Sequence, residues 1–185
     1  MEKKYVIFDL DGTLIDSIPD MCREISLLLK DCGRRPLTKD EAESVIGHGA
    51  KHMIEGAFAL TGEPLSPERC EEILKVWINQ YSHAQMNLTK PWEGVPETLQ
   101  KLKKDGYHIM KKLDLEQYFE VVLHADSLPV RKPRPEPLWE AVRRMGGTND
   151  QAVMVGDSEP DAEAAKNAGF PVILLSFGYA RKPMK

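Results

Sequence analysis

Cysteine is scarce in this sequence. Its 185 residues include only three cysteines, Cys22, Cys32 and Cys70. No two of them have the spacing of two intervening residues that is typical of zinc and redox motifs. An odd number with this spacing argues against a disulfide framework and against a zinc site. We therefore expect reduced thiols in a cytoplasmic protein.

Long apolar runs and an excess of positive charge are also absent. No apolar stretch approaches the ~18 residues that a membrane span requires, and MEKK leads into a strand-like run without a signal-peptide apolar region. The formal charge of −4 and the lack of a basic block argue against a nucleic-acid partner. We expect a globular protein with no membrane or nucleic-acid partner, either a monomer or a weak homodimer.

The clearest secondary-structure signal is a set of short apolar, β-branched-rich runs, at residues 4–9, 120–126, 152–156 and 171–178. Continuous apolar runs of this length are typical of strands buried on both faces of a parallel sheet. An alanine-rich helix closed by Gly169 separates the last two runs, and this is the order of a βαβ unit. Further helices are expected over 96–105 and 134–145.

Residues 18–88 differ from the rest of the chain. They show several helical patterns and no convincing strand, and TKDE at 38–41 fits a capping box. An all-helical block inserted after the first strand predicts two domains in an α/β fold. A Rossmann-like parallel-sheet core would comprise residues 1–17 and 89–185, and a helical cap would comprise residues 18–88.

Two aspartates follow the first predicted strand. Asp9 and Asp11 come just after YVIF, and parallel sheets gather their functional groups at the carboxyl ends of strands. Gly12 then permits a sharp turn of the backbone. For this motif alone, a simple Asp-Gly-Thr turn without chemistry is the alternative.

A second acidic pair follows the strand at 152–156. Asp157 ends this strand, and Asp161 lies four residues later near a helix start. If the two strands are neighbours, Asp157 lies near Asp9 and Asp11, and carboxylates so close repel unless a cation joins them. A set of oxygen ligands alone favours Mg²⁺. Capping of a helix N-terminus is the alternative role for the second pair.

The segment VRKPRPEP supplies a candidate cation for this region. Lys132 precedes Pro133 in a proline-rich loop, and a residue before proline is held extended. A lysine fixed in this way would reach a phosphate as a point charge. The alternative is a solvent-facing lysine beside Arg131 and Arg134.

Together these segments resemble the haloacid dehalogenase superfamily of phosphohydrolases over nearly the whole chain. DLDGTLIDS is similar to the first motif of the superfamily, RKPRP to the third and VGDSEPD to the fourth, and the helical insertion resembles a C1-type cap. Within the superfamily, IGHGAKHMIEGAF, PWEGVPETLQKLKKDGY and VVLHADSLPVRKPRPEP are most similar to phosphoglycolate phosphatases and their near relatives.

The resemblance implies a two-step phosphoryl transfer from a small phosphorylated metabolite. Asp9 would attack phosphorus and form an aspartyl-phosphate, and Asp11 would protonate the leaving group and then activate water. Mg²⁺ would be held by Asp9, by the main-chain carbonyl of Asp11 and by Asp157. Asp161 would adjust the surroundings of these ligands, and Lys132 would balance the charge on the phosphoryl group.

The same resemblance implies further ligands of the substrate. Gly12, Thr13 and Lys132 would bind the phosphate. In the cap, His48 and Lys51 are candidates for binding a small anionic substrate, and a solvated helix face is the alternative for each. A sugar-phosphate mutase or a pyrophosphatase on the same core is the alternative activity.

The sequence departs from the superfamily at the second motif. There a strand ends in a serine or threonine that binds the phosphoryl group, but Met110 runs directly into Lys111, and no serine or threonine occurs between Thr98 and Ser127. Only ten residues, 111–120, precede the next strand, fewer than a parallel crossover usually needs. Either the sequence omits a segment, or a true deletion has removed a phosphate ligand and left a catalytically impaired protein.

Overall fold

Four strands form a parallel sheet in the order β4-β1-β5-β6: β4 (His108–Ile109), β1 (Tyr5–Phe8), β5 (Ala152–Gly156) and β6 (Val172–Leu174). Each neighbouring pair is parallel, and Phe8 is in register with Val155. The predicted parallel sheet is therefore confirmed, and so is the pairing of the strands that precede Asp9 and Asp157. Their carboxyl ends lie side by side.

The computed structural model describes residues 4–46, 49–109, 119–121, 123 and 127–179. It divides the chain into two compact units, of which one comprises Met1–Ile15 with Pro91–Lys185 and the other comprises Asp16–Lys90. Two short strands, β2 (Ile15–Asp16) and β3 (Lys90–Pro91), pair where the chain passes between the units.

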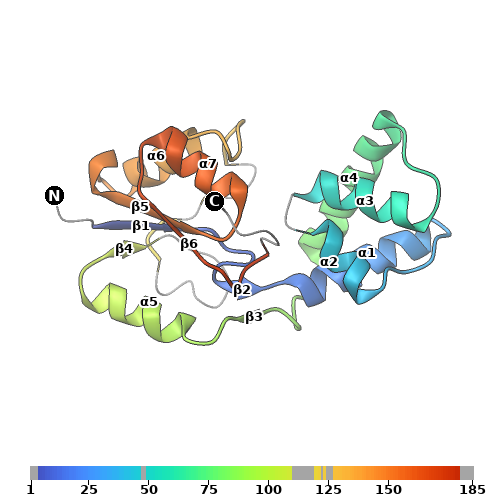
Figure 1. The fold of residues 1–185 in the computed structure, drawn as a ribbon, viewed down its shortest axis with the longest axis horizontal. Coiled ribbons are helices and arrows are strands. Elements are labelled where there is room, and N and C mark those ends of the chain that lie inside the picture. Colours follow the sequence, from blue (N-terminus) through green and yellow to red (C-terminus); the bar gives the residue numbers. More distant parts are fainter. Residues whose placement is uncertain (1–3, 47–48, 110–118, 122, 124–126, 180–185) are drawn as a thin grey trace. The chain divides into compact units, whose positions relative to one another are not determined.

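Helices cover both faces of the parallel sheet, as Figure 1 shows for α6 and α7 on one face and α5 on the other. Their bounds are α5 (Val95–Lys104), α6 (Glu136–Arg144) and α7 (Glu159–Ala168), with a short 3-10 helix, η2 (Asn149–Gln151). Tyr5 and Ile7 of β1 belong to the core formed with α6 and α7. Leu99 of α5 is buried in a second cluster, which Phe8 borders. Side chains of β1 are thus buried on both faces, as its continuous apolar run predicts.

The second unit contains four helices in its described part: α1 (Ile18–Asp31), α2 (Lys39–Val45), α3 (Ala50–Thr61) and α4 (Pro67–His83). Its core includes Ile25, Leu29, Ile54 and Phe58, each at most 2% exposed. Thr38 and Glu41 form the capping box that the sequence predicts for α2. No helix in the described part of the chain combines the length and the apolar character that crossing a membrane would need.

The strand expected over 171–178 is shorter than predicted. β6 ends at Leu174. The amide of the next residue, Leu175, donates to the carbonyl of Gly156 at 2.9 Å, and the chain turns directly after it. This turn brings the amide of Tyr179 to the carboxylate of Asp157. The strand expected over 120–126 lies largely outside the described residues.

Candidate active site

Asp9 and Lys132 form an ion pair at the carboxyl end of β1. The Asp9 amide donates to the carbonyl of Val155 at 2.8 Å, so the ladder between β1 and β5 holds this residue in place. Lys132 Nζ lies 2.5 Å from Asp9 Oδ1 and also contacts Asp161 Oδ1. Two carboxylates from distant segments therefore share one ammonium group, and the solvent-facing alternative for this lysine is excluded.

Asp157 follows β5 and is only 1% exposed. Its Oδ1 accepts a hydrogen bond from the Thr13 hydroxyl at 2.8 Å, and its Oδ2 accepts one from the amide of Tyr179 at 2.6 Å. Glycines pack closely around it, because a Cβ atom at Gly12 or at Gly178 would overlap the Asp157 side chain. Gly12 also has a φ of 88°, which disfavours any other residue there.

Asp161 is fully buried and caps the N-terminus of α7. Its Oδ2 accepts hydrogen bonds from the Ser158 hydroxyl at 2.5 Å and from the amides of Ser158 and Asp157 at 3.2 and 3.3 Å. The capping role that the sequence left open is therefore real for Asp161. Since its other oxygen contacts Lys132, this carboxylate links the lysine to the strand end that carries Asp157.

The donor set suits a hard divalent cation. Asp9, Asp157 and Asp161 each offer one carboxylate oxygen, and these oxygens lie within 4.8 Å of one another. Such ligands fit Mg²⁺ or Ca²⁺ and not a soft metal. An ionised carboxylate oxygen can accept about two hydrogen bonds or metal contacts, so Asp157 keeps ligand capacity beyond its bonds to Thr13 and Tyr179.

Burial and like charge shift the acid–base properties of this cluster. Burial raises the pKa of Asp9 to about 6, and the charge on Asp161 adds to this rise while Lys132 opposes it. Burial also raises the pKa of Asp157, against the hydrogen bonds from Tyr179 and Thr13. For Lys132, burial disfavours the charged form, but the charges of Asp9 and Asp161 outweigh it and raise the pKa. Several shifted groups at the end of a parallel sheet are typical of a functional site.

The comparisons with known proteins agree with this geometry. A family model described as haloacid dehalogenase-like hydrolase matches residues 6–175. The chain belongs to this family of hydrolases. The predicted α/β class, Rossmann-like core and enzymatic nature are thereby confirmed.

The relatives of this hydrolase carry consistent names. The phosphoglycolate phosphatase of Caulobacter vibrioides is 34% identical over 194 aligned positions, which cover 97% of this chain and 82% of the relative. The phosphoglycolate phosphatase of Mesorhizobium japonicum is 31% identical over 199 positions, covering 100% of this chain and 88% of the relative. A crystal structure from Haemophilus somnus, described as a predicted phosphoglycolate phosphatase, has a TM-score of 0.83 and 28% identity, covering 97% of this chain and 88% of that one.

Main-chain groups of the loop after β1 form hydrogen bonds with one another. The Gly12 amide donates to the carbonyl of Ile15 at 2.9 Å, and the Thr13 amide donates to that of Leu10 at 3.2 Å. Asp11 pairs with Ile15 through a β-bridge. The hydrogen-bonding protons of Gly12 and Thr13 are thus engaged within the protein, and the phosphate-binding role expected for them stays a prediction.

Lys51 and His48 are the residues of the helical unit that are expected to bind substrate, and the second motif is expected near Met110. Lys51 lies on α3, where its Nζ forms an exposed ion pair with Glu71 Oε1 at 2.6 Å. His48 lies outside the described residues, and so does the segment 110–118 around the junction of Met110 and Lys111. The role of both cap residues in substrate binding stays a prediction.

Two residues that contribute to the site, Trp92 and Tyr179, are not indicated by the sequence. Trp92 Nε1 donates to the carbonyl of Gly12 at 3.1 Å, and Tyr179 uses its amide on Asp157. Nothing in a sequence pattern indicates which backbone amide or carbonyl will meet a distant side chain. Trp92 is separated from Gly12 by 80 positions, and its ring predicts packing alone.

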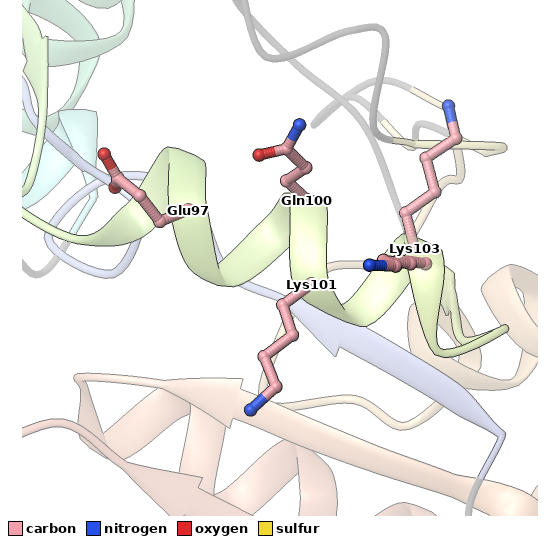
Figure 2. Close-up of a pocket in the computed structure, with 5 residues that line it drawn as sticks. Glu97, Gln100, Lys101 and Lys103 are labelled. Carbon is pink, nitrogen blue, oxygen red and sulfur yellow. The ribbon is translucent and has the colours of Figure 1, made fainter.

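A hollow of about 610 Å³ lies along α5, and none of the aspartates of the acidic cluster lines it. It is lined by one glutamate, one glutamine and three lysines: Glu97, Gln100, Lys101, Lys103 and Lys104. In Figure 2, Gln100 and Lys101 extend from opposite sides of the helix. These residues form a solvated helix surface, and none of them was a candidate site residue.

Proposed function

We propose that this chain is a Mg²⁺-dependent phosphatase of small phosphorylated metabolites, with 2-phosphoglycolate as the first substrate to test. One observation carries the proposal: Asp9, Asp157 and Lys132, from three separate segments, meet at the ends of two paired parallel strands. The names of the relatives support the substrate class. The helical unit would be the cap domain of this enzyme.

Asp9 is assigned the role of nucleophile. One of its carboxylate oxygens would form a bond to phosphorus while the bond from phosphorus to the substrate's ester oxygen breaks. Asp11, two residues later, would give its proton to the departing alkoxide. It would then take a proton from the water that attacks the aspartyl-phosphate, which releases inorganic phosphate and restores both side chains.

Lys132 would hold the transferring phosphoryl group. Its ammonium already lies beside Asp9, and the raised pKa keeps it protonated at neutral pH. A cation fixed at this place stabilises the negative charge on the phosphoryl oxygens during transfer. Asp161 also pairs with this ammonium group and would keep the lysine in position.

Asp9, Asp157 and the main-chain carbonyl of Asp11 would hold the metal. When bound, Mg²⁺ would offset the like charges of the carboxylates and orient a phosphate oxygen. Asp161 is assigned an indirect part, because its Oδ1 pairs with Lys132 and its Oδ2 already accepts three hydrogen bonds at the start of α7. Cytoplasmic location and a monomeric or weakly dimeric state stay predictions.

Phosphate release from 2-phosphoglycolate and from p-nitrophenyl phosphate tests this function. We expect release in Mg²⁺, none in EDTA, and none from Asp9→Asn in either condition. Asp31→Asn is the matched control, since this aspartate is exposed at the end of α1 and its neutralisation should leave activity unchanged. Full activity in Asp9→Asn would refute the assignment of the nucleophile.

A catalytically impaired protein is the second candidate, and one observation favours it. The alignment with the Mesorhizobium japonicum relative has 199 positions and covers all 185 residues of this chain, so the relative contains internal residues that this chain lacks. This agrees with the absence of the second motif between Met110 and Lys111. The impaired protein would bind Mg²⁺ but release no phosphate, and insertion of the relative's segment at this junction should then restore turnover.

A further inference from the structure

Trp92 contacts two active-site segments that are far apart in the sequence. Its amide donates to the carbonyl of Leu14 at 3.0 Å, and its indole Nε1 donates to the carbonyl of Gly12 at 3.1 Å. The indole ring also meets the ring of Phe177 edge to face, with centroids 5.6 Å apart and an interplanar angle of 67°. One side chain thus joins the loop after β1 to the turn after β6.

These two segments are the ones that hold Asp157. Thr13, next to Gly12, donates its hydroxyl to Oδ1, and Tyr179, two residues after Phe177, donates its amide to Oδ2. Each oxygen of the carboxylate therefore depends on a segment that Trp92 contacts. The indole proton has no other described acceptor, and its loss would leave the carbonyl of the peptide between Gly12 and Thr13 without this donor.

We propose that Trp92 is a positioning residue that orients the Asp157 carboxylate for a divalent cation through Thr13 and Tyr179. The inference rests on the proposed function, in which Asp157 is a metal ligand. Groups that hydrogen-bond a metal ligand fix the orientation of that ligand. Their removal typically weakens metal binding by about 10–100-fold. Trp92 acts one step further out, so its effect should lie near the lower end of that range.

The chain offers a matched control in the same unit. Trp139 lies on α6, and its Nε1 donates at 3.2 Å to the carbonyl of Ala168, at the end of α7. Both indoles thus donate to a main-chain carbonyl, but only that of Trp92 reaches an active-site loop. Replacement by phenylalanine removes the donor at either position and keeps an aromatic ring for packing.

The experiment titrates Mg²⁺ alone into the full chain by calorimetry. Trp92→Phe should bind Mg²⁺ about tenfold more weakly than the unaltered protein, and Trp139→Phe should bind it equally well. In phosphate release, Trp92→Phe should raise the Mg²⁺ concentration needed for half-maximal rate, with kcat at saturating Mg²⁺ nearly unchanged. A purely structural role would instead lower the melting temperature in EDTA and leave Mg²⁺ affinity unaltered.

A double-mutant cycle with Thr13→Val tests the route of this effect. If Trp92 acts through Thr13, the double variant should lose clearly less affinity than the two single losses combined. Phe177→Ala provides an independent test through Tyr179, should Trp92→Phe fail to fold, and it should also weaken Mg²⁺ binding.

The outcomes separate this inference from the proposed function. If the unaltered protein binds no Mg²⁺, the proposed metal site is wrong and the inference falls with it. If Asp157→Asn abolishes binding while Trp92→Phe and Phe177→Ala bind as the unaltered protein does, only the inference is overturned. Equal weakening by Trp92→Phe and Trp139→Phe would also overturn it, because the effect would then not depend on the active-site loops.

Discussion

The two units of the chain bury aspartates in opposite ways. In the α/β unit, the half-buried Asp9 and the buried Asp157 and Asp161 lie within reach of one another, and one lysine, Lys132, pairs with two of them, Asp9 and Asp161. In the helical unit, Asp20 is fully buried and surrounded by donors. Its Oδ2 accepts from the amides of Leu88 and Thr89 and from the Thr89 hydroxyl, at 3.0, 2.6 and 2.7 Å.

Arg23 completes the surroundings of Asp20 with an ion pair of 2.9 Å to Oδ1. A carboxylate whose charge is matched by several donors on one oxygen and by an arginine at the other stabilises the fold, here by joining the start of α1 to the chain after α4. Carboxylates that face one another leave negative charge uncompensated, and such clusters are typical of functional sites. The partners of a buried charge, more than its burial, therefore distinguish a structural group from a functional one.

Replacement by asparagine at Asp9 and at Asp20 tests this comparison, and these two substitutions should have the largest effects. Asp9→Asn is expected to lower phosphate release by about 10⁴-fold or more, as loss of a nucleophile does. Its unfolding midpoint in EDTA should stay unchanged or rise, because like-charge repulsion is relieved. Asp20→Asn should lower the free energy of unfolding by about 2 kcal/mol, since an amide cannot replace a charged acceptor of several donors.

Urea unfolding and phosphate release, measured on both variants, check this prediction. The activity of Asp20→Asn per folded molecule should remain that of the unaltered protein. Equal destabilisation by the two substitutions would contradict the distinction between the two kinds of buried aspartate.

Substitution of two glycines tests the packing around Asp157 within the α/β unit. Gly178→Ala would place a Cβ atom against the Asp157 side chain, so Mg²⁺ affinity should fall by about 10-fold or more. Gly146→Ala is the control, because its φ is 74° but no atom lies near the new Cβ. It should cost about 1 kcal/mol of stability through backbone strain and leave Mg²⁺ affinity unchanged. Calorimetric titration with Mg²⁺ and urea unfolding measure the two effects.

Much of the sheet and of the acidic cluster could be predicted from the sequence, because both depend on local signals. Continuous apolar runs indicate buried strands, and Asp9 and Asp157 come immediately after two of them. The topology of parallel sheets then brings such residues together without any knowledge of side-chain packing. The capping box of Thr38 and Glu41 was likewise predictable from four consecutive residues.

What the sequence did not indicate depends on main-chain groups meeting distant side chains. Every residue carries an amide and a carbonyl, so no pattern marks Tyr179 as the donor to Asp157 or Gly12 as the acceptor from Trp92. The end of β6 was missed for a related reason. Leu175 and Phe177 continue an apolar pattern, although the chain turns there to reach the carboxylate.

Thr89→Val tests the donors around Asp20 with a smaller effect. It removes the hydroxyl donor at 2.7 Å and leaves the amides of Leu88 and Thr89 in place, so the free energy of unfolding should fall by about 1 kcal/mol. Thr61→Val is the control in the same unit, because its hydroxyl donates to a helix carbonyl, that of Ala57. It should change stability by less than about 0.5 kcal/mol in urea unfolding. Equal effects would show that Asp20 gains nothing from this donor.

The smallest effect concerns Glu41, a half-buried carboxylate near the surface whose oxygens also accept from donors. Arg35 donates to both oxygens of Glu41, at 2.8 Å each, and this lowers the pKa of Glu41 to about 2, with the amide of Thr38 adding to the shift. A folded-state pKa below the ordinary value of 4.5 gives stability above that pH, which is lost as the pH falls towards 2.

Glu41→Gln should therefore lower the melting temperature slightly at pH 7, and the difference from the unaltered protein should vanish between pH 4.5 and 2. Glu43→Gln is the matched control on the same helix, since its pair with Lys39 is longer, at 3.8 Å, and it should change little. Melting curves across this pH range measure both. A difference that persists at pH 2 would mean that Glu41 stabilises α2 by packing or by a neutral hydrogen bond, and that matched donors matter less at the surface than around Asp20.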